Sequence, residues 1–250
     1  MLNIVIPMAG RGSRFASAGF ADPKPLIPVH DMRMIELVIH NLTPSEPHKF
    51  IFICQTDHIA RYNLGTKLAS WAPNCKIVAI DGVTDGAACT VLLAKEFIDN
   101  DEPLMIANSD QYIDCSIDAY LASMADLDGL IMTMKADDPK WSFVGFSSSG
   151  NVERVVEKQV ISDEATVGIY NFRSGRAFVE AAEQMIEEGD RVNGEYYVAP
   201  VYNYQVASGA KIGTYNVGKE GNGMYGLGIP SDLSVFLSLP VSDAAKRNPA

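Results

Sequence analysis

The feature that constrains this chain most is an apolar strand that runs straight into a glycine-rich loop. Residues Leu2–Pro7 are mostly apolar and β-branched, which predicts a buried strand. The next residues, Met8–Phe15, contain two glycines in three positions, and glycine lets the backbone turn sharply and approach a ligand closely. Exposed N–H groups in such a loop can bind phosphate oxygens. Arg11 and Arg14 add cationic donors that can bind phosphate in a bidentate manner.

A lysine held between two prolines follows about ten residues later, in the segment Asp22-Pro23-Lys24-Pro25-Leu26. Proline fixes its own φ angle and restricts the residue before it, so the ammonium group of Lys24 is oriented at little entropic cost. Together with the loop, this lysine predicts an anion-binding site. The pattern fits neither the ATPase phosphate loop nor the dinucleotide fingerprint. A surface turn with solvated charges is the alternative interpretation of the glycines alone.

The rest of the chain predicts an α/β protein of one continuous domain, residues 1–250, with a mainly parallel sheet flanked by helices. Strands are predicted at 49–54, 76–80, 103–107, 130–135, 143–147, 152–157, 166–172 and 211–216, and helices at 34–42, 57–71, 87–98, 174–188, 196–208 and 233–239. Asp57 is a candidate helix cap, 233–239 is expected to be the final helix, and residues 243–250 are expected to fray. Ligands of such sheets lie beyond the carboxyl ends of the strands, where both the glycine loop and Asn108-Ser109-Asp110 fall.

Charge and cysteine usage narrow the class of protein. The net charge of −11 argues against nucleic-acid binding but not against a nucleotide substrate, which local Arg and Lys side chains can bind. The four cysteines have no Cys-x-x-Cys spacing, which favours reduced thiols over zinc ligands. The chain contains no apolar run long enough for a membrane helix and no charged leader before the first strand, so we expect a cytoplasmic protein.

Two segments together suggest a family. Pro7-Met8-Ala9-Gly10-Arg11-Gly12-Ser13-Arg14-Phe15 with Pro23-Lys24-Pro25-Leu26 resembles the signature of the sugar-phosphate nucleotidyltransferases, or nucleotide-sugar pyrophosphorylases. The resemblance extends from Ile4 to about Leu237 and implies a GT-A-like nucleotidyltransferase fold, Rossmann-like, with a nucleotide-binding half at 1–128 and an acceptor-binding half at 129–240. It implies that the loop residues bind the triphosphate of an NTP: Ala9, Gly10, Arg11, Gly12 and Ser13. Arg14 and Lys24 would be catalytic and neutralise charge.

The nucleotide half contains three further candidates. Asp110 follows a buried strand, and a carboxylate there can hold Mg²⁺, although capping a turn is the alternative. The resemblance favours the metal and makes Asp110 both catalytic and a ligand of Mg²⁺. The small residues Gly86, Ala87 and Ala88 would bind the nucleotide base by resemblance, or simply allow close packing at a helix start. Gln55 is a weaker candidate for contact with the base, with a plain surface amide as the alternative.

The acceptor-binding candidates come from the second half of the chain. By resemblance, Lys158 binds the acceptor phosphate and Glu157 binds sugar hydroxyls, whereas an exposed Glu-Lys pair alone indicates only solvated charges. Gly168 lies in a strand, where a glycine often marks the close approach of a ligand, and Tyr170 follows it. Glu195 belongs to Asn193-Gly194-Glu195-Tyr196-Tyr197, which resembles a segment that reads sugar hydroxyls; the two tyrosines are equally compatible with the core.

One position departs from the family pattern. Many relatives carry a second metal-binding Asp two residues before a Gly-Thr-Pro turn, where this chain has Gly226. Asp232 follows the turn and is expected to cap the last helix. The number of protein ligands to the metal therefore stays open.

The reaction implied is attack by a phosphate oxygen of a sugar 1-phosphate on the α-phosphorus of an NTP, with release of pyrophosphate. Such a reaction needs positioning and charge neutralisation, not a side-chain nucleophile. Two alternatives remain: a cytidylyltransferase acting on a non-sugar phosphate or phosphonate such as phosphocholine, and a catalytically idle nucleotide-binding domain. The partners expected are the NTP and a phosphorylated small molecule, without nucleic acid or membrane, and homo-oligomerisation stays open.

Overall fold

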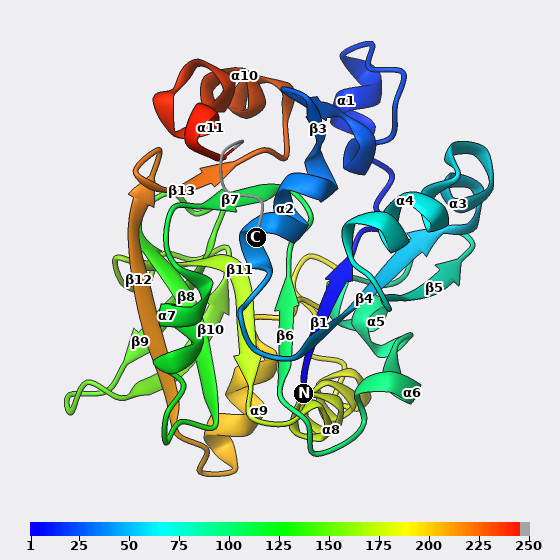
Figure 1. Ribbon diagram of the computed structural model, residues 1–250. Coiled ribbons are helices and arrows are strands. Elements are labelled where there is room, and N and C mark those ends of the chain that lie inside the picture. The colour runs from blue at the N-terminus through cyan, green and yellow to red at the C-terminus, as the bar shows by residue number, and fades with distance from the viewer. Residues whose placement is uncertain (246–250) are drawn as a thin grey trace.

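The computed structural model describes residues 1–245 and is built around one eleven-stranded sheet (Figure 1). Its strands are β1 (Leu2–Pro7), β4 (His48–Gln55), β5 (Lys76–Ile80), β6 (Leu104–Ala107), β7 (Gln111–Ile113), β8 (Gly129–Lys135), β9 (Ser142–Phe146), β10 (Val152–Glu157), β11 (Glu164–Phe172), β12 (Ile212–Glu220) and β13 (Gly223–Gly226). The order is β5-β4-β1-β6-β11-β8-β12-β13-β7, with the β9–β10 hairpin attached to β11. A separate hairpin pairs β2 (Pro28–Val29) with β3 (Met32–Arg33).

The first half of the sheet is parallel, and β1 is at its centre. Ile4 of β1 lies opposite Phe50 of β4 on one side and Met105 of β6 on the other. The chain adds β4 and β5 on one side of β1 and then crosses to add β6 on the other side. The strand order therefore reverses next to β1, and open α/β sheets bind their ligands at such a topological switch point. β11 runs antiparallel between β6 and β8, which makes the whole sheet mixed. The predicted fold class, a mixed and mainly parallel sheet flanked by helices, is confirmed.

Helices cover both faces of the sheet. They are α1 (Ser13–Ser17), α2 (Met34–Leu42), α3 (Thr56–Tyr62), α4 (Leu64–Trp71), α5 (Ala87–Leu92), α6 (Lys95–Ile98), α7 (Ile117–Ala122), α8 (Gly175–Glu187), α9 (Val201–Ala207), α10 (Pro230–Ser238) and α11 (Pro240–Ala245), with a 3₁₀ turn at Lys24–Leu26. Apolar residues of α2, α4 and α7 share one hydrophobic cluster with the sheet, and those of α5, α6, α8 and α9 share another. In Figure 1 the helices α10 and α11 lie together at one end of the molecule, above β13 and β7.

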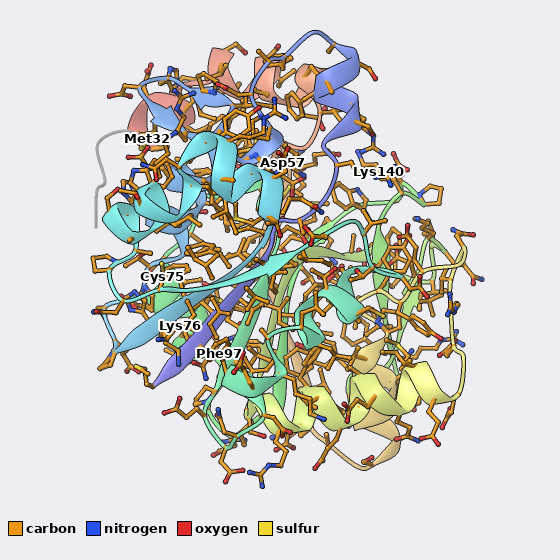
Figure 2. All side chains as sticks on the ribbon, turned by 90° about the vertical axis from the view of Figure 1, so that its right-hand side faces the viewer. Met32, Asp57, Cys75, Lys76, Phe97 and Lys140 are labelled. Carbon is orange, nitrogen blue, oxygen red and sulfur yellow. The ribbon has the colours of Figure 1, made fainter. Side chains whose placement is uncertain are left out.

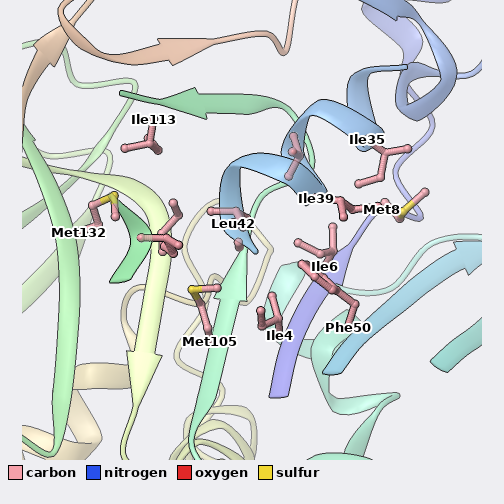
Figure 3. Packing of buried hydrophobic residues seen from close by; sticks show 14 of the residues in the cluster. Ile4, Ile6, Met8, Ile35, Ile39, Leu42, Phe50, Met105, Ile113 and Met132 are labelled. Atoms are coloured by element: carbon pink, nitrogen blue, oxygen red, sulfur yellow. The ribbon is translucent and has the colours of Figure 1, made fainter. Parts of the chain in front are cut away.

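The alternation of side chains along β1 explains why both layers form. Ile4 and Ile6 point into the cluster that contains α2, and Figure 3 shows them beside Ile39 and Phe50. Val5 points to the opposite face. A strand that is apolar on both faces needs cover on both sides, so the sequence of β1 requires a three-layer arrangement. Seen from the β5 edge, with Cys75 and Lys76 labelled, side chains fill the space between the layers (Figure 2).

Two predicted helices are interrupted. The helix expected at 57–71 is split into α3 and α4 by Asn63, which adopts a left-handed conformation with φ of 50°, a conformation that Asn tolerates better than most residues. Asp57 was expected to cap this helix, but Gln55 occupies that position and Asp57 lies in the first turn. The helix expected at 87–98 is likewise divided into α5 and α6.

The prediction of a helix at 196–208 is wrong for its first residues, because α9 starts only at Val201. Before it, the backbone of Tyr196 is held by two hydrogen bonds to another loop, from its N–H to the Asp85 carbonyl (2.7 Å) and from the Ala88 N–H to its carbonyl (3.0 Å). These tertiary bonds replace helical ones, which local residue preferences cannot reveal.

The predicted last helix is followed by another, α11, which contains the first three of the residues expected to fray. Residues 246–250 of that prediction lie outside the described residues. The short elements α1, α7, β2, β3, β7 and β13 were not predicted.

The four cysteines are free thiols. Burial raises the pKa of the Cys54 thiol to about 12, so it stays protonated. Within residues 1–245, every helix is too short or too polar to cross a bilayer.

Tyr202 of α9 tests how the helix layer formed by α5, α6, α8 and α9 is bonded to the sheet. Its buried hydroxyl donates to the Asn171 carbonyl (2.9 Å), and its ring stacks on Phe172 with 4.6 Å between centroids. We expect Tyr202→Phe to lower the free energy of unfolding by about 1–2 kcal/mol, because a buried carbonyl loses its donor. Urea denaturation measures this change.

The matched control is Tyr204→Phe on the same helix, whose hydroxyl contacts the exposed carboxylates of Glu188 and Asp190. We expect a change below about 0.5 kcal/mol for it. Equal losses in the two variants would contradict the assignment of the stabilising bond to Tyr202.

Candidate active site

The loop that follows β1 presents a row of unpaired backbone donors. The Met8 N–H still continues the ladder by donating to the Ile53 carbonyl (3.0 Å), but the N–H groups of residues 9–14 donate to no backbone carbonyl in the described part of the chain. Gly12 has φ of 61°, a left-handed conformation that turns the chain into α1. Backbone N–H groups left free in a concave loop form an anion-binding surface.

Lys24 lies against this loop. A Cβ atom on Gly12 would be 3.2 Å from the Lys24 Cβ, so the two segments are in direct contact. The Lys24 Nζ donates to the Asp110 Oδ2 at 2.7 Å, and each side chain is 24% exposed. The loop after β1, the proline-framed lysine and the carboxylate after β6 are therefore in one place, as the sequence predicts.

Asp110 is held on its other side by a glycine turn. The Leu227 N–H donates to the Asp110 carbonyl oxygen (2.8 Å), and a Cβ atom on Gly228 would lie only 2.6 Å from the Asp110 Oδ2. Any larger residue at 228 would displace the carboxylate. Gly228 thus makes room for the Asp110 carboxylate itself.

This arrangement fits Mg²⁺ only in combination with other oxygen ligands. No group of three or more His, Cys, Asp or Glu side chains gathers at a common point among residues 1–245. Asp110 supplies a single, partly exposed carboxylate, and Mg²⁺ commonly takes one or two carboxylates together with phosphate oxygens and water. The donor set is therefore adequate for Mg²⁺ that is brought by a polyphosphate.

Arg11, Ser13 and Arg14 lie at the rim of the loop and are exposed. Among the described residues, neither guanidinium group takes part in an ion pair within 4.0 Å, unlike Arg33, which binds Asp22 (3.1 Å). Both arginines can therefore turn to an anion without breaking an existing pair.

Gln55, at the end of β4, anchors the glycine loop by hydrogen bonds. Its Nε2 donates to the carbonyl oxygens of Ala9 and Gly82. The amide thus joins the glycine loop to the loop after β5. Its donor atom is engaged in these two bonds, which is a structural use that the sequence did not indicate.

The small residues at 86–88 are explained mainly by close packing. A Cβ atom on Gly86, whose φ is 123°, would lie 2.4 Å from the Tyr196 carbonyl oxygen. Ala88 has no exposed surface. Ala87 lines a cavity.

That cavity, of about 290 Å³, adjoins the sheet between the two halves of the chain. Its lining includes Ala87 and Asn108 from the first half, and Glu157, Gly168 and Tyr170 from the second half. The structure therefore brings together acceptor-binding candidates that are separated in sequence.

The space that the missing side chain of Gly168 leaves is occupied by the side chain of Asn108. Gly168 has φ of 81°, and a Cβ atom there would be 2.0 Å from the Asn108 Nδ2. The Asn108 N–H also donates to the Gly168 carbonyl (3.0 Å). The glycine thus admits the Asn108 side chain, which the sequence analysis did not single out, to the wall of the cavity.

Glu157 and Lys158 point to different surroundings although they are adjacent. Glu157 is 9% exposed and accepts a hydrogen bond from the Ser142 hydroxyl. Burial raises the pKa of Glu157, while the Ser142 bond and the Lys158 charge act in the opposite direction. Lys158 has φ of 56°, and its Nζ donates to the Tyr197 hydroxyl at 2.6 Å.

The two tyrosines that the sequence left undecided have different roles. Tyr196 is a core residue, 3% exposed, whereas Tyr197 lines the cavity. Glu195 is exposed, and its carboxylate helps to raise the pKa of Tyr197, after burial as the largest cause. Trp141 and Ser142, which also line the cavity, were missed because no spacing or motif distinguishes them from ordinary strand residues.

The expected capping role of Asp232 is wrong. Ile229 occupies the N-cap position of helix α10, and no side chain there accepts a capping hydrogen bond. Asp232 lies in the first turn of the helix. Its Oδ2 is 3.6 Å from the position that a Cβ atom on Gly226 would occupy.

Comparisons with known proteins identify the family and the fold of the chain. A family model described as nucleotidyl transferase matches residues 4–203. The nucleoside-diphosphate-sugar pyrophosphorylase from Vibrio cholerae RC9 superimposes with a TM-score of 0.82 at 25% identity, covering 94% of this chain and 100% of that one. A comparison with curated proteins gave no match.

Two further solved structures share the fold at lower identity. A UDP-glucose pyrophosphorylase complexed with UDP-glucose has a TM-score of 0.74 at 15% identity, covering 99% of each chain. The inositol-1-phosphate CTP transferase from T. maritima has a TM-score of 0.73 at 14% identity, covering 99% of this chain and 97% of that one. Since the family model spans well over half of the chain, the protein belongs to the nucleotidyl transferase family.

Proposed function

We propose that this nucleotidyltransferase joins an NTP to a sugar 1-phosphate, giving a nucleotide-sugar and pyrophosphate. The observation that carries the proposal is the loop of residues 9–14, whose N–H groups lack backbone acceptors, lying directly beside Lys24 and Asp110. This surface suits a triphosphate. The cavity at Glu157 suits the acceptor, since it lies between the two halves of the sheet.

The reaction brings two anions together, so the chain must position them and offset their charge. The N–H groups of residues 9–14 would bind the phosphates of the NTP, and Lys24 would turn from Asp110 to a phosphate oxygen. Arg14 would stabilise the charge that develops at the α-phosphorus. Lys158 would hold the acceptor phosphate, whose oxygen is itself the nucleophile.

Mg²⁺ bound at Asp110 would offset negative charge on the phosphates during transfer. The carboxylate of Asp110, for which Gly228 makes room, would hold it. In this assignment residues 1–128 bind the nucleotide and residues 129–240 bind the acceptor, in a single cytoplasmic domain.

A second candidate acceptor is a phosphorylated quaternary amine such as phosphocholine. The aromatic rings of Trp141, Tyr170 and Tyr197 line the same cavity as the Glu157 carboxylate. Aromatic faces with a carboxylate attract quaternary ammonium groups. The rings already attract cations, since the Lys158 Nζ lies 4.8 Å from the centre of the Tyr197 ring.

The proposal is tested by measuring pyrophosphate release with each NTP paired with a panel of acceptors. The panel contains glucose 1-phosphate, other sugar 1-phosphates and phosphocholine. We expect release that depends on Mg²⁺ and on a sugar 1-phosphate. Release with CTP and phosphocholine alone would establish the second candidate, and no release with any pair would contradict transferase activity on these substrates.

Arg14 tests the charge-offsetting mechanism. We expect Arg14→Ala to lower kcat by about 10²-fold or more, because it removes one preorganised donor from the transition state. The control is Arg176→Ala, which changes an exposed guanidinium group on α8 that pairs with Asp101 (3.5 Å). Unchanged turnover in Arg14→Ala would remove this side chain from the mechanism.

Asp110 tests the metal assignment. We expect Asp110→Asn to weaken Mn²⁺ binding in the presence of NTP by about 10-fold or more, because an amide carries no charge to offset that of the cation. Titration calorimetry with Mn²⁺ measures this directly, and Asp126→Asn, at an exposed loop position, is the control. Equal affinities in the wild type and Asp110→Asn would refute the assignment.

A further inference from the structure

Four buried side chains form a continuous polar network in one wall of the cavity. Ser142 begins β9 and Glu157 ends β10, and they are cross-strand partners. Thr166 and Tyr170 lie in β11 on either side of its irregular register. Exposed fractions of 3–9% place all four side chains away from bulk solvent, and all four line the cavity.

Hydroxyl groups connect these side chains to one another. The Ser142 Oγ donates to the Glu157 Oε2, and the Tyr170 hydroxyl interacts with Ser142. The Tyr170 hydroxyl lies 3.0 Å from the Thr166 Oγ1. Burial raises the pKa of Tyr170, so its hydroxyl stays protonated and neutral. The network therefore ends at one carboxyl group, that of Glu157, whose pKa is raised by burial.

A buried carboxylate is costly unless something offsets its charge. No Lys, Arg or His side chain lies within 4.0 Å of the Glu157 oxygens among the described residues. The Lys158 ammonium, which is bonded to Tyr197, favours ionisation only at longer range, and the Glu195 carboxylate opposes it. The Ser142 hydroxyl is thus the side chain that hydrogen-bonds directly to the charged form, and such a bond favours ionisation.

We propose that Ser142 is a positioning residue for the acceptor site: it keeps Glu157 ionised despite burial and leaves the second oxygen, Oε1, for the acceptor. This inference rests on the proposed function for the site, but not on the identity of the acceptor. A sugar hydroxyl would donate to Oε1, and a quaternary ammonium would be attracted to the same charge. Tyr170 interacts with Ser142, and Thr166 contacts Tyr170 in turn.

The direction of the pH effect follows from this arrangement. The ionised form of Glu157 binds the acceptor, so acceptor affinity is lost as pH falls through the pKa of Glu157. Removing the Ser142 hydroxyl removes a contribution that lowers this pKa. The loss of acceptor binding should then begin at a higher pH in Ser142→Ala than in the wild type.

The first test is a titration of the free protein followed by ¹³C NMR with δ-¹³C-labelled glutamate, in which Glu157→Gln assigns the resonance. We expect the Glu157 midpoint to move upward in Ser142→Ala and to stay unchanged in Ser149→Ala. Ser149 is an exposed hydroxyl in the turn of the same hairpin. An unchanged or lower midpoint in Ser142→Ala would overturn the inference, whatever the substrate.

The second test uses steady-state kinetics with glucose 1-phosphate as the probe acceptor, or phosphocholine if only that compound supports turnover. At neutral pH we expect Ser142→Ala to raise the acceptor KM by about 10-fold, with kcat and the NTP KM changed less than twofold. The acid limb of kcat/KM for the acceptor should shift to higher pH. Ser142→Thr, which keeps the hydroxyl, should restore most of the affinity.

The proposed function and the role of Ser142 can be refuted separately. If the wild type releases no pyrophosphate with any acceptor, the proposed function fails while the titration still decides the role of Ser142. If the wild type is active and Ser142→Ala shows the wild-type acceptor KM and pH profile, the inference about Ser142 is wrong and the function stands.

Discussion

The hydrogen bonding of β1 along both of its edges determines the arrangement of the whole site. Because β4 and β6 both run parallel to β1, the chain segments that leave β1 and β6 emerge at the same edge of the sheet. The glycine loop and Asp110 are these segments. A single strand at the switch point therefore brings a set of backbone donors to within contact of a carboxylate about a hundred residues later in sequence, and Lys24 bridges them.

Glycines at three positions allow backbone and side chains to approach more closely than a Cβ atom would permit. Gly86 meets the backbone of Tyr196, Gly168 meets the amide of Asn108, and Gly228 meets the carboxylate of Asp110. In each case the nearby group belongs to a distant segment, so these residues join the two halves of the site. The lack of a side chain at these positions therefore allows close packing within the protein.

The sequence was most informative where the signal is local. The strand Leu2–Pro7, its loop, Lys24 in its proline frame and the position of Asp110 all follow from short patterns, and the structure brings them together. The surroundings of Glu157 could not be predicted, because they depend on Ser142 and Tyr170 meeting across strands. The late start of α9, at Val201, and the hydrogen bonds of Gln55 also arise from contacts between distant segments, which residue preferences do not encode.

The ion pair between Lys24 and Asp110 has a thermodynamic consequence for a chain that takes up an NTP with a divalent cation. A phosphate that draws Lys24 away leaves the partly buried carboxylate without a counter-charge, and a cation that engages Asp110 leaves the ammonium group in the same position. Either ligand alone must bear the cost of separating the pair, whereas the two together share it. Under the proposed function, nucleotide and cation would therefore bind cooperatively, and by linkage each would raise the affinity for the other by the same factor.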